Sequence, residues 1–127
     1  MLADTRSRNA SAVREASSRA RRLGRPVLAS WTEPASLEAI SFFARASTTT
    51  DRALWLRPAS GEALVGIGAA HTLTGTGEDR FRQVGDAWRD LLADAVFDDD
   101  VVGQPCGGPL LLGGFSFDPT RREASTR

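Results

Sequence analysis

Apolar residues recur at helical spacing between Glu78 and Val96. The apolar positions of this segment fall on one side of a helix, and charged residues occupy the other side. The apolar side holds Phe81, Val84, Trp88, Leu91, Leu92 and Ala95. The pattern predicts an amphipathic helix over residues 78–96, begun by a capping box of Thr76 and Asp79. We expect its apolar side to pack on the chain's own sheet, with docking of a partner helix as the alternative.

Two shorter stretches also have helical spacing. The N-terminal positions are Val13, Ala16, Ala20 and Leu23, and the later ones are Leu37, Ile40, Phe43 and Ala44. Gly24 follows the first set as a typical helix stop, and Ser36 precedes the second set as a typical N-cap. The sequence therefore predicts a helix that ends near Gly24 and a short core-facing helix over residues 37–46.

Short apolar runs between turn residues predict strands. Residues 27–31 form one such run, which ends before Glu33-Pro34. Residues 52–57 and 63–73 flank a loop of turn-forming residues at 58–62. This arrangement predicts a hairpin in which the third strand returns beside the second.

The most apolar stretch runs from Pro109 to Pro119 and predicts a buried central strand. Its large side chains do not alternate regularly, so they would point to both faces of the sheet. We therefore expect either that both faces are covered or that Gly113-Gly114 forms a bulge. A close backbone approach from another layer would account for the paired glycines. Because the sequence given ends eight residues after Pro119, we also expect this strand to belong to a larger whole.

The amino-acid composition argues against several classes of function. No apolar run is long enough to cross a membrane, and the formal net charge of zero gives no electrostatic case for nucleic acid or an acidic membrane. The single cysteine, Cys106, rules out an internal disulfide and fits the reducing cytoplasm. Every basic side chain is arginine. This chain alone therefore cannot perform chemistry that requires a lysine amine.

Arginine is concentrated at the N-terminus. Residues 1–25 contain seven arginines but only Asp4 and Glu15 as acids. An organelle transit peptide or a nucleic-acid-binding arm would have such a composition. The arginines are not interleaved with aromatic residues, and the apolar stripe is weak. We therefore interpret residues 1–24 as a polar, partly frayed helix on the surface.

Three motifs resemble functional sites without meeting their requirements. Gly66-Ile67-Gly68-Ala69-Ala70-His71 has His71 where a dinucleotide fingerprint needs Gly or Ala, and the predicted strand continues where a helix should begin. His71 is interpreted as a strand-surface residue without a catalytic partner. Asp98-Asp99-Asp100 lacks the alternating ligands of a calcium loop and is interpreted as a solvated helix exit. Cys106 has no neighbouring base in the sequence, so a reactive thiol is only weakly indicated.

Three stretches, taken in order, resemble a known family. They are residues 27–31 (Val-Leu-Ala-Ser-Trp), residues 66–70 with Phe81 and the following helix, and residues 113–119 (Gly-Gly-Phe-Ser-Phe-Asp-Pro). In order and spacing they are similar to the N-terminal portion of the isochorismate synthases. These belong to the chorismate-utilising enzymes, with the salicylate, anthranilate and aminodeoxychorismate synthases. The last stretch is the most specific, and the resemblance covers roughly residues 25–119.

The resemblance implies an α+β fold in which antiparallel sheets are flanked by helices. It also implies a reaction in which Mg²⁺ holds the chorismate carboxylate, a lysine activates water, and a glutamate protonates the departing hydroxyl. The family places these groups in its C-terminal portion. No catalytic, cofactor-binding or metal-binding residue is therefore assigned in this chain, and we expect it to bind no Mg²⁺ by itself.

The sequence thus predicts three parts: a basic helical segment at 1–24, the N-terminal portion of a chorismate-binding domain at 25–119, and a non-matching tail at 120–127. The predicted function is that of an inactive N-terminal fragment of a cytoplasmic isochorismate synthase, an isomerase of menaquinone or siderophore biosynthesis. Chorismate is the implied substrate. The alternatives are a fragment of a salicylate or anthranilate synthase and a small self-contained α+β interaction domain.

Overall fold

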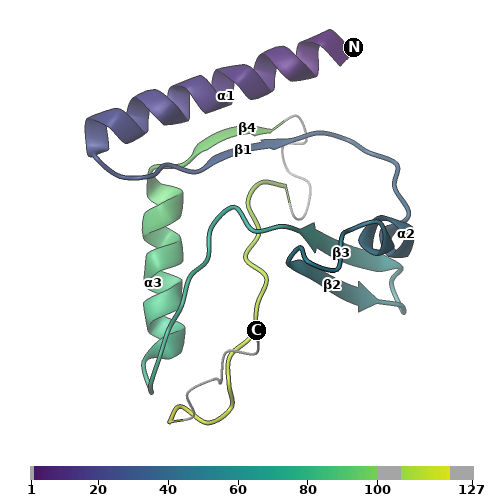
Figure 1. The fold of residues 1–127 in the computed structure, drawn as a ribbon, viewed down its shortest axis with the longest axis vertical. Coiled ribbons are helices and arrows are strands. Elements are labelled where there is room, and N and C mark those ends of the chain that lie inside the picture. The colour runs from purple at the N-terminus through teal and green to yellow at the C-terminus, as the bar shows by residue number, and fades with distance from the viewer. Residues whose placement is uncertain (1, 100–106, 121–127) are drawn as a thin grey trace. The chain divides into compact units, whose positions relative to one another are not determined.

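The computed structural model of the chain describes residues 2–99 and 107–120 (Figure 1). The chain falls into two compact units. Residues 1–34, 73–110 and 115–127 belong to the first unit, and residues 35–72 and 111–114 belong to the second. Helices and small sheets are mixed along the chain, which confirms the predicted α+β class. None of the helices that the structure describes is both long and apolar enough to span a membrane.

The first unit is built on a pair of parallel strands. Strand β1 (Ala29–Thr32) pairs with β4 (Val96–Asp99), and Ala29 lies opposite Val96. Helix α1 (Leu2–Leu23) contacts both strands (Figure 1). Ala12 and Ala16 of α1 are buried against Val96. Small side chains on the helix allow it to lie close to the strands, so two alanines and a valine form the centre of this core.

Helix α1 confirms the predicted polar N-terminal helix, but a different face is buried. Ala16 is buried as expected, whereas Val13 and Leu23 are 47% and 44% exposed. The helix stops at Gly24, whose φ of 65° lies in the left-handed region and whose N–H donates to the Ala20 carbonyl over 2.9 Å. Glycine adopts this conformation without the steric cost of a Cβ, as the sequence predicted.

Helix α3 (Arg80–Ala93) is shorter than the predicted helix over residues 78–96. It ends early because Val96 begins β4 and donates its N–H to the Leu28 carbonyl over 2.8 Å. Val84 is buried, but Phe81, at the start of the predicted apolar side, is 58% exposed. The amphipathic pattern therefore predicts where the helix lies. It does not predict that Phe81, in the first turn, is left exposed.

The predicted capping box at the start of α3 is wrong. The N-cap residue is Asp79, and its side chain makes no capping hydrogen bond. The Gln83 side-chain amide instead accepts from the Thr76 N–H and donates to the Thr76 carbonyl, each over 3.1 Å. Gly77, with a φ of 72°, turns the chain between Thr76 and the helix, so the Thr76 backbone rather than its hydroxyl holds the first turn.

The second unit is a hairpin with a short helix. Strands β2 (Arg52–Arg57) and β3 (Glu62–Ile67) are antiparallel, as predicted, with Arg52 opposite Ile67. The third strand was expected to reach residue 73 but ends at Ile67. It ends there because Gly68 has a φ of 76°, which turns the chain away from the extended conformation after its N–H donates a last hydrogen bond to the Asp51 carbonyl over 2.7 Å.

Helix α2 (Ala39–Ala44) begins later than the sequence predicts, and Ser36 is not its cap. The Glu38 carboxylate accepts from the N–H groups of Ile40 and Ser41 over 3.1 and 2.7 Å. Hydrogen bonds from Ser41, and then from Ile40, hold the pKa of Glu38 below its ordinary value. A carboxylate at this position also faces the positive end of the helix dipole, which favours Glu38 over the serine two residues earlier.

The predicted central strand at residues 109–119 is wrong. The described residues of this stretch are irregular, and Leu110, Leu111, Phe115 and Phe117 are exposed. Leu112 contacts the hairpin, since a Cβ placed on Gly66 would lie 3.3 Å from its Cδ1 atom. Apart from their neighbours in the chain, no described residue comes within 4 Å of the Cβ positions of Gly113 and Gly114. The apolar side chains of this stretch therefore pack singly or face solvent, and among the described residues the stretch joins no sheet.

Candidate functional site

Arg80, the first residue of α3, is a charged side chain that the structure buries, with 9% of its surface exposed. Its Nη1 donates to the Gly77 carbonyl over 2.9 Å, and its Nη2 donates to the Phe117 carbonyl over 3.2 Å. The buried Nε has no hydrogen-bond partner among the described residues. Arg80 therefore joins the beginning of α3 to the irregular segment that follows Phe115.

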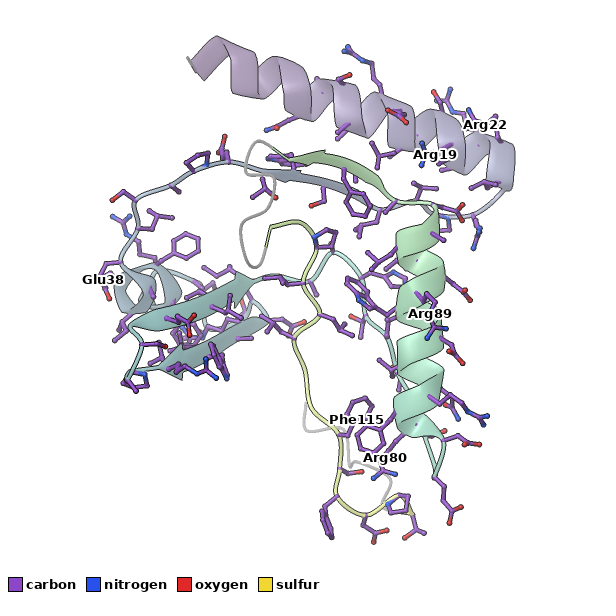
Figure 2. All side chains as sticks on the ribbon, turned by 180° about the vertical axis from the view of Figure 1, so that it is seen from behind. Arg19, Arg22, Glu38, Arg80, Arg89 and Phe115 are labelled. Atoms are coloured by element: carbon purple, nitrogen blue, oxygen red, sulfur yellow. The ribbon has the colours of Figure 1, made fainter. Side chains whose placement is uncertain are left out.

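An aromatic ring pair lies beside this arginine. The Phe81 and Phe115 ring centroids lie 4.4 Å apart with an interplanar angle of 49°, and the Arg80 Cζ lies 4.6 Å from the Phe81 centroid. Arg80 and Phe115 lie together at the N-terminal end of α3 (Figure 2). Phe117 is fully exposed, at 101% of its reference surface. We call Phe81, Phe115 and Phe117 the aromatic tip.

A tight turn follows the aromatic tip. The Asp118 Oδ1 accepts from the Thr120 N–H over 2.8 Å and from the Thr120 hydroxyl over 2.6 Å, while Ser116 donates to the Asp118 carbonyl over 3.0 Å. The Thr120 hydroxyl and amide hold the pKa of Asp118 below its ordinary value, and the positive charge of Arg80 lowers it further. Side chains therefore fix this turn locally, in the way that Asp commonly does.

The opposite end of α3 is held by arginines of the N-terminal segment. Arg19 donates from Nη1 to the carbonyls of Asp94 and Ala95 over 3.0 and 3.2 Å, and its Nη2 pairs with Glu15 over 2.7 Å. Arg25 pairs with the Asp94 carboxylate. Cations suit the C-terminal end of a helix, where carbonyls lack partners and the dipole is negative. These arginines stabilise the fold, which favours the interpretation of the segment as a surface helix.

In the part of the chain that it describes, the structure does not bring the candidate motifs of the sequence together at one site. After Gly68 the chain stays irregular until α3 begins at Arg80, so the Gly66–His71 stretch does not open a helix. His71 is exposed, but it lies in this irregular segment and not on a strand. The backbones of Asp98 and Asp99 belong to β4, which corrects their interpretation as a helix exit. Asp100 and Cys106 lie outside the described residues.

The described residues do not bring three or more His, Cys, Asp or Glu side chains together in an arrangement that could hold a metal ion. They therefore offer no ligand set that fits the Mg²⁺ of the enzymes that the sequence resembles. The sequence-based prediction missed Arg80. A cation in the first turn of a helix opposes the helix dipole, and this anomaly is the signal that could have identified it.

Comparisons with known proteins agree with the resemblance in the sequence. The pattern of the chorismate binding enzyme family matches residues 12–127. The isochorismate synthase MenF of Bacillus subtilis (strain 168) is 31% identical over 96 residues, which make up 71% of this chain and 20% of that protein. The chain thus spans about one fifth of the length of this curated relative. No solved structure matches the chain.

Proposed function

This chain belongs to the chorismate-binding enzyme family, and on that premise we propose that it is the N-terminal part of an isochorismate synthase. Such an enzyme converts chorismate to isochorismate for menaquinone or siderophore biosynthesis. The observation that carries the proposal is the 31% identity to an isochorismate synthase over 96 residues. The proposed location is the cytoplasm, in keeping with a single cysteine.

Isochorismate formation adds water to the chorismate ring and removes a hydroxyl group, so it needs a base for the water and an acid for the leaving group. In the proposed enzyme a lysine and a glutamate supply these functions, and Mg²⁺ holds the substrate carboxylate. The present chain contains no lysine. We propose that it contributes scaffold rather than reacting groups and that it does not turn over chorismate by itself.

Contacts within the chain support the proposed scaffold role. Residues Ala12 and Ala16 hold α1 on the β1–β4 pair, and Arg19 holds α1 to the C-terminal end of α3. Parallel strands are normally covered on both faces, yet Phe97 of β4 is 46% exposed. Such a pair is typical of part of a larger sheet, which supports the proposal that further polypeptide completes it.

The genomic DNA beyond codon 127 tests this proposal. Read in all frames, it is expected to encode a segment with the lysine and glutamates of the family. The joined polypeptide, incubated with chorismate and Mg²⁺, is expected to form isochorismate, with the joined polypeptide lacking that lysine as the matched control. Formation of salicylate instead, or of anthranilate when ammonium is also supplied, would replace the proposal by one of its alternatives, and absence of any such segment would contradict it.

A further inference from the structure

We propose that the aromatic tip, Phe81 with Phe115 and Phe117, is a docking surface for the polypeptide that carries the rest of the chorismate-binding domain. This inference rests on the proposed function and adds to it the residues through which the two portions meet. The surface of that polypeptide that receives the tip is apolar and uncharged.

The tip presents a large apolar area to solvent. Phe81, Phe115 and Phe117 are 58%, 43% and 101% exposed, which together equals about two whole phenylalanine side chains. Since each such side chain buries roughly 150–250 Å² when it is covered, the tip offers on the order of 300–500 Å². That is comparable to the largest apolar patch on a typical monomer, and such patches commonly mark contact sites.

The backbone that carries the tip is also held in place before any partner binds. Arg80 contacts the Phe81 ring and donates to the Phe117 carbonyl, and the Asp118 turn fixes the chain just after Phe117. This arrangement places a cation at the unfavourable end of a helix and leaves its Nε without a partner among the described residues. Fixing the backbone of an exposed phenylalanine at such a cost is expected where that residue serves as an anchor for a partner.

The charges around the tip indicate the chemistry of the occupant. Arg80 is directed to backbone carbonyls, and Arg82 pairs with Asp79 over 2.8 Å. The two Nη groups of Arg80 and the Arg82 guanidinium already have partners within the chain, so an acidic partner would gain little from them. An apolar cleft that receives the Phe117 ring fits better.

The length of the relative favours the rest of the domain over a second copy. About four fifths of that isochorismate synthase has no counterpart in this chain. Among the described residues, no large side chain is fully buried, and the buried apolar residues are all Ala or Val. A copy-to-copy contact would cover one patch, whereas a long partner can complete this sparse core.

The test uses the 127-residue chain and the B. subtilis isochorismate synthase from which the aligned segment has been deleted. Binding is measured by fluorescence anisotropy of the labelled chain, and isochorismate formation is measured in the mixture. Because Phe117 is fully exposed, F117A is expected to leave the thermal melt of the isolated chain unchanged and to weaken binding at least tenfold. The control V13A removes an exposed apolar side chain on α1 and is expected to change binding less than twofold.

The outcomes separate this inference from the proposed function. Binding that F117A does not weaken overturns the inference and leaves the proposed function standing. Absence of binding also overturns it, and if the chain instead self-associates through Phe117, the occupant is a second copy. Binding that depends on Phe117 in a mixture that forms no isochorismate supports the docking surface and counts against the proposed function.

Discussion

The guanidinium of Arg80 donates a hydrogen bond to the backbone carbonyl of Phe117, 37 positions later in the chain, over 3.2 Å. The same group donates to the Gly77 carbonyl and stacks on the Phe81 ring. One side chain thus joins the turn before α3, the first turn of that helix and the segment that carries Phe115 and Phe117.

Replacing Arg80 with methionine should loosen the aromatic tip. Hydrogen bonds from a charged donor contribute about 1.5–3 kcal/mol each, but removing the buried Nε and the unfavourable dipole interaction offsets part of the loss. We expect R80M to lower the free energy of unfolding in urea by about 1–2 kcal/mol. R80K keeps the positive charge but lacks the planar guanidinium. Its free energy of unfolding should therefore lie between those of R80M and the unmodified chain. An R80M chain as stable as the unmodified one would show that Arg80 does not hold the tip.

Replacing Arg19 should destabilise the junction between α1 and the end of α3. The substitution R19M removes the donors to the Asp94 and Ala95 carbonyls, and the expected loss is about 1–2 kcal/mol in the free energy of unfolding. Arg22, which is exposed in the last turn of α1, supplies the control, and R22M should change stability by less than about 0.5 kcal/mol. Equal effects of the two substitutions would mean that only the total charge of the helix matters.

Two glycines should respond oppositely to alanine. Gly68 has a φ of 76°, so G68A should destabilise the hairpin by about 1–2 kcal/mol in a thermal or urea melt. Gly113 does not have a positive φ, and the described chain leaves the space around its Cβ position open to 4 Å. We therefore expect G113A to be neutral or to stabilise the chain by about 0.4–1 kcal/mol, because alanine restricts the unfolded chain. A strongly destabilising G113A would restore the close backbone approach predicted from the sequence.

The pKa of Asp118 should reveal the turn after the aromatic tip. Since that pKa lies below its ordinary value of 3.8 in the folded chain, the ionised carboxylate stabilises the turn at higher pH. This stabilisation is lost as the pH falls through the lower, folded-state pKa. An NMR titration should therefore give a midpoint below 3.8, and T120A should move it upward because Thr120 is the main cause. S116A, which removes a donor to the Asp118 carbonyl only, should leave the midpoint in place.

Local patterns in the sequence predicted the elements whose stabilising contacts are also local. The hairpin follows from strands separated by a short turn, and Arg57 and Glu62 at its end form an ion pair over 3.2 Å. The helix around Val84 follows from its periodicity. Gly24 was also interpreted correctly, since it ends α1.

The sequence could not predict the contacts between distant segments. Nothing in residues 27–31 or 96–99 indicates that they pair in parallel, because the two runs are separated by more than 60 residues and either orientation fits their pattern. The run at 109–119 was predicted as a strand because apolar residues between turns are typical of one. Hydropathy does not reveal whether a neighbouring strand edge is present, and the described residues of this run remain irregular.

The measurement that bears most directly on the whole account is chorismate turnover by the purified 127-residue chain in the presence of Mg²⁺, followed by chromatography of the products. The account predicts no isochorismate above the buffer control, because the chain contains no lysine to activate water. Isochorismate formation that rises with the concentration of the chain would contradict it.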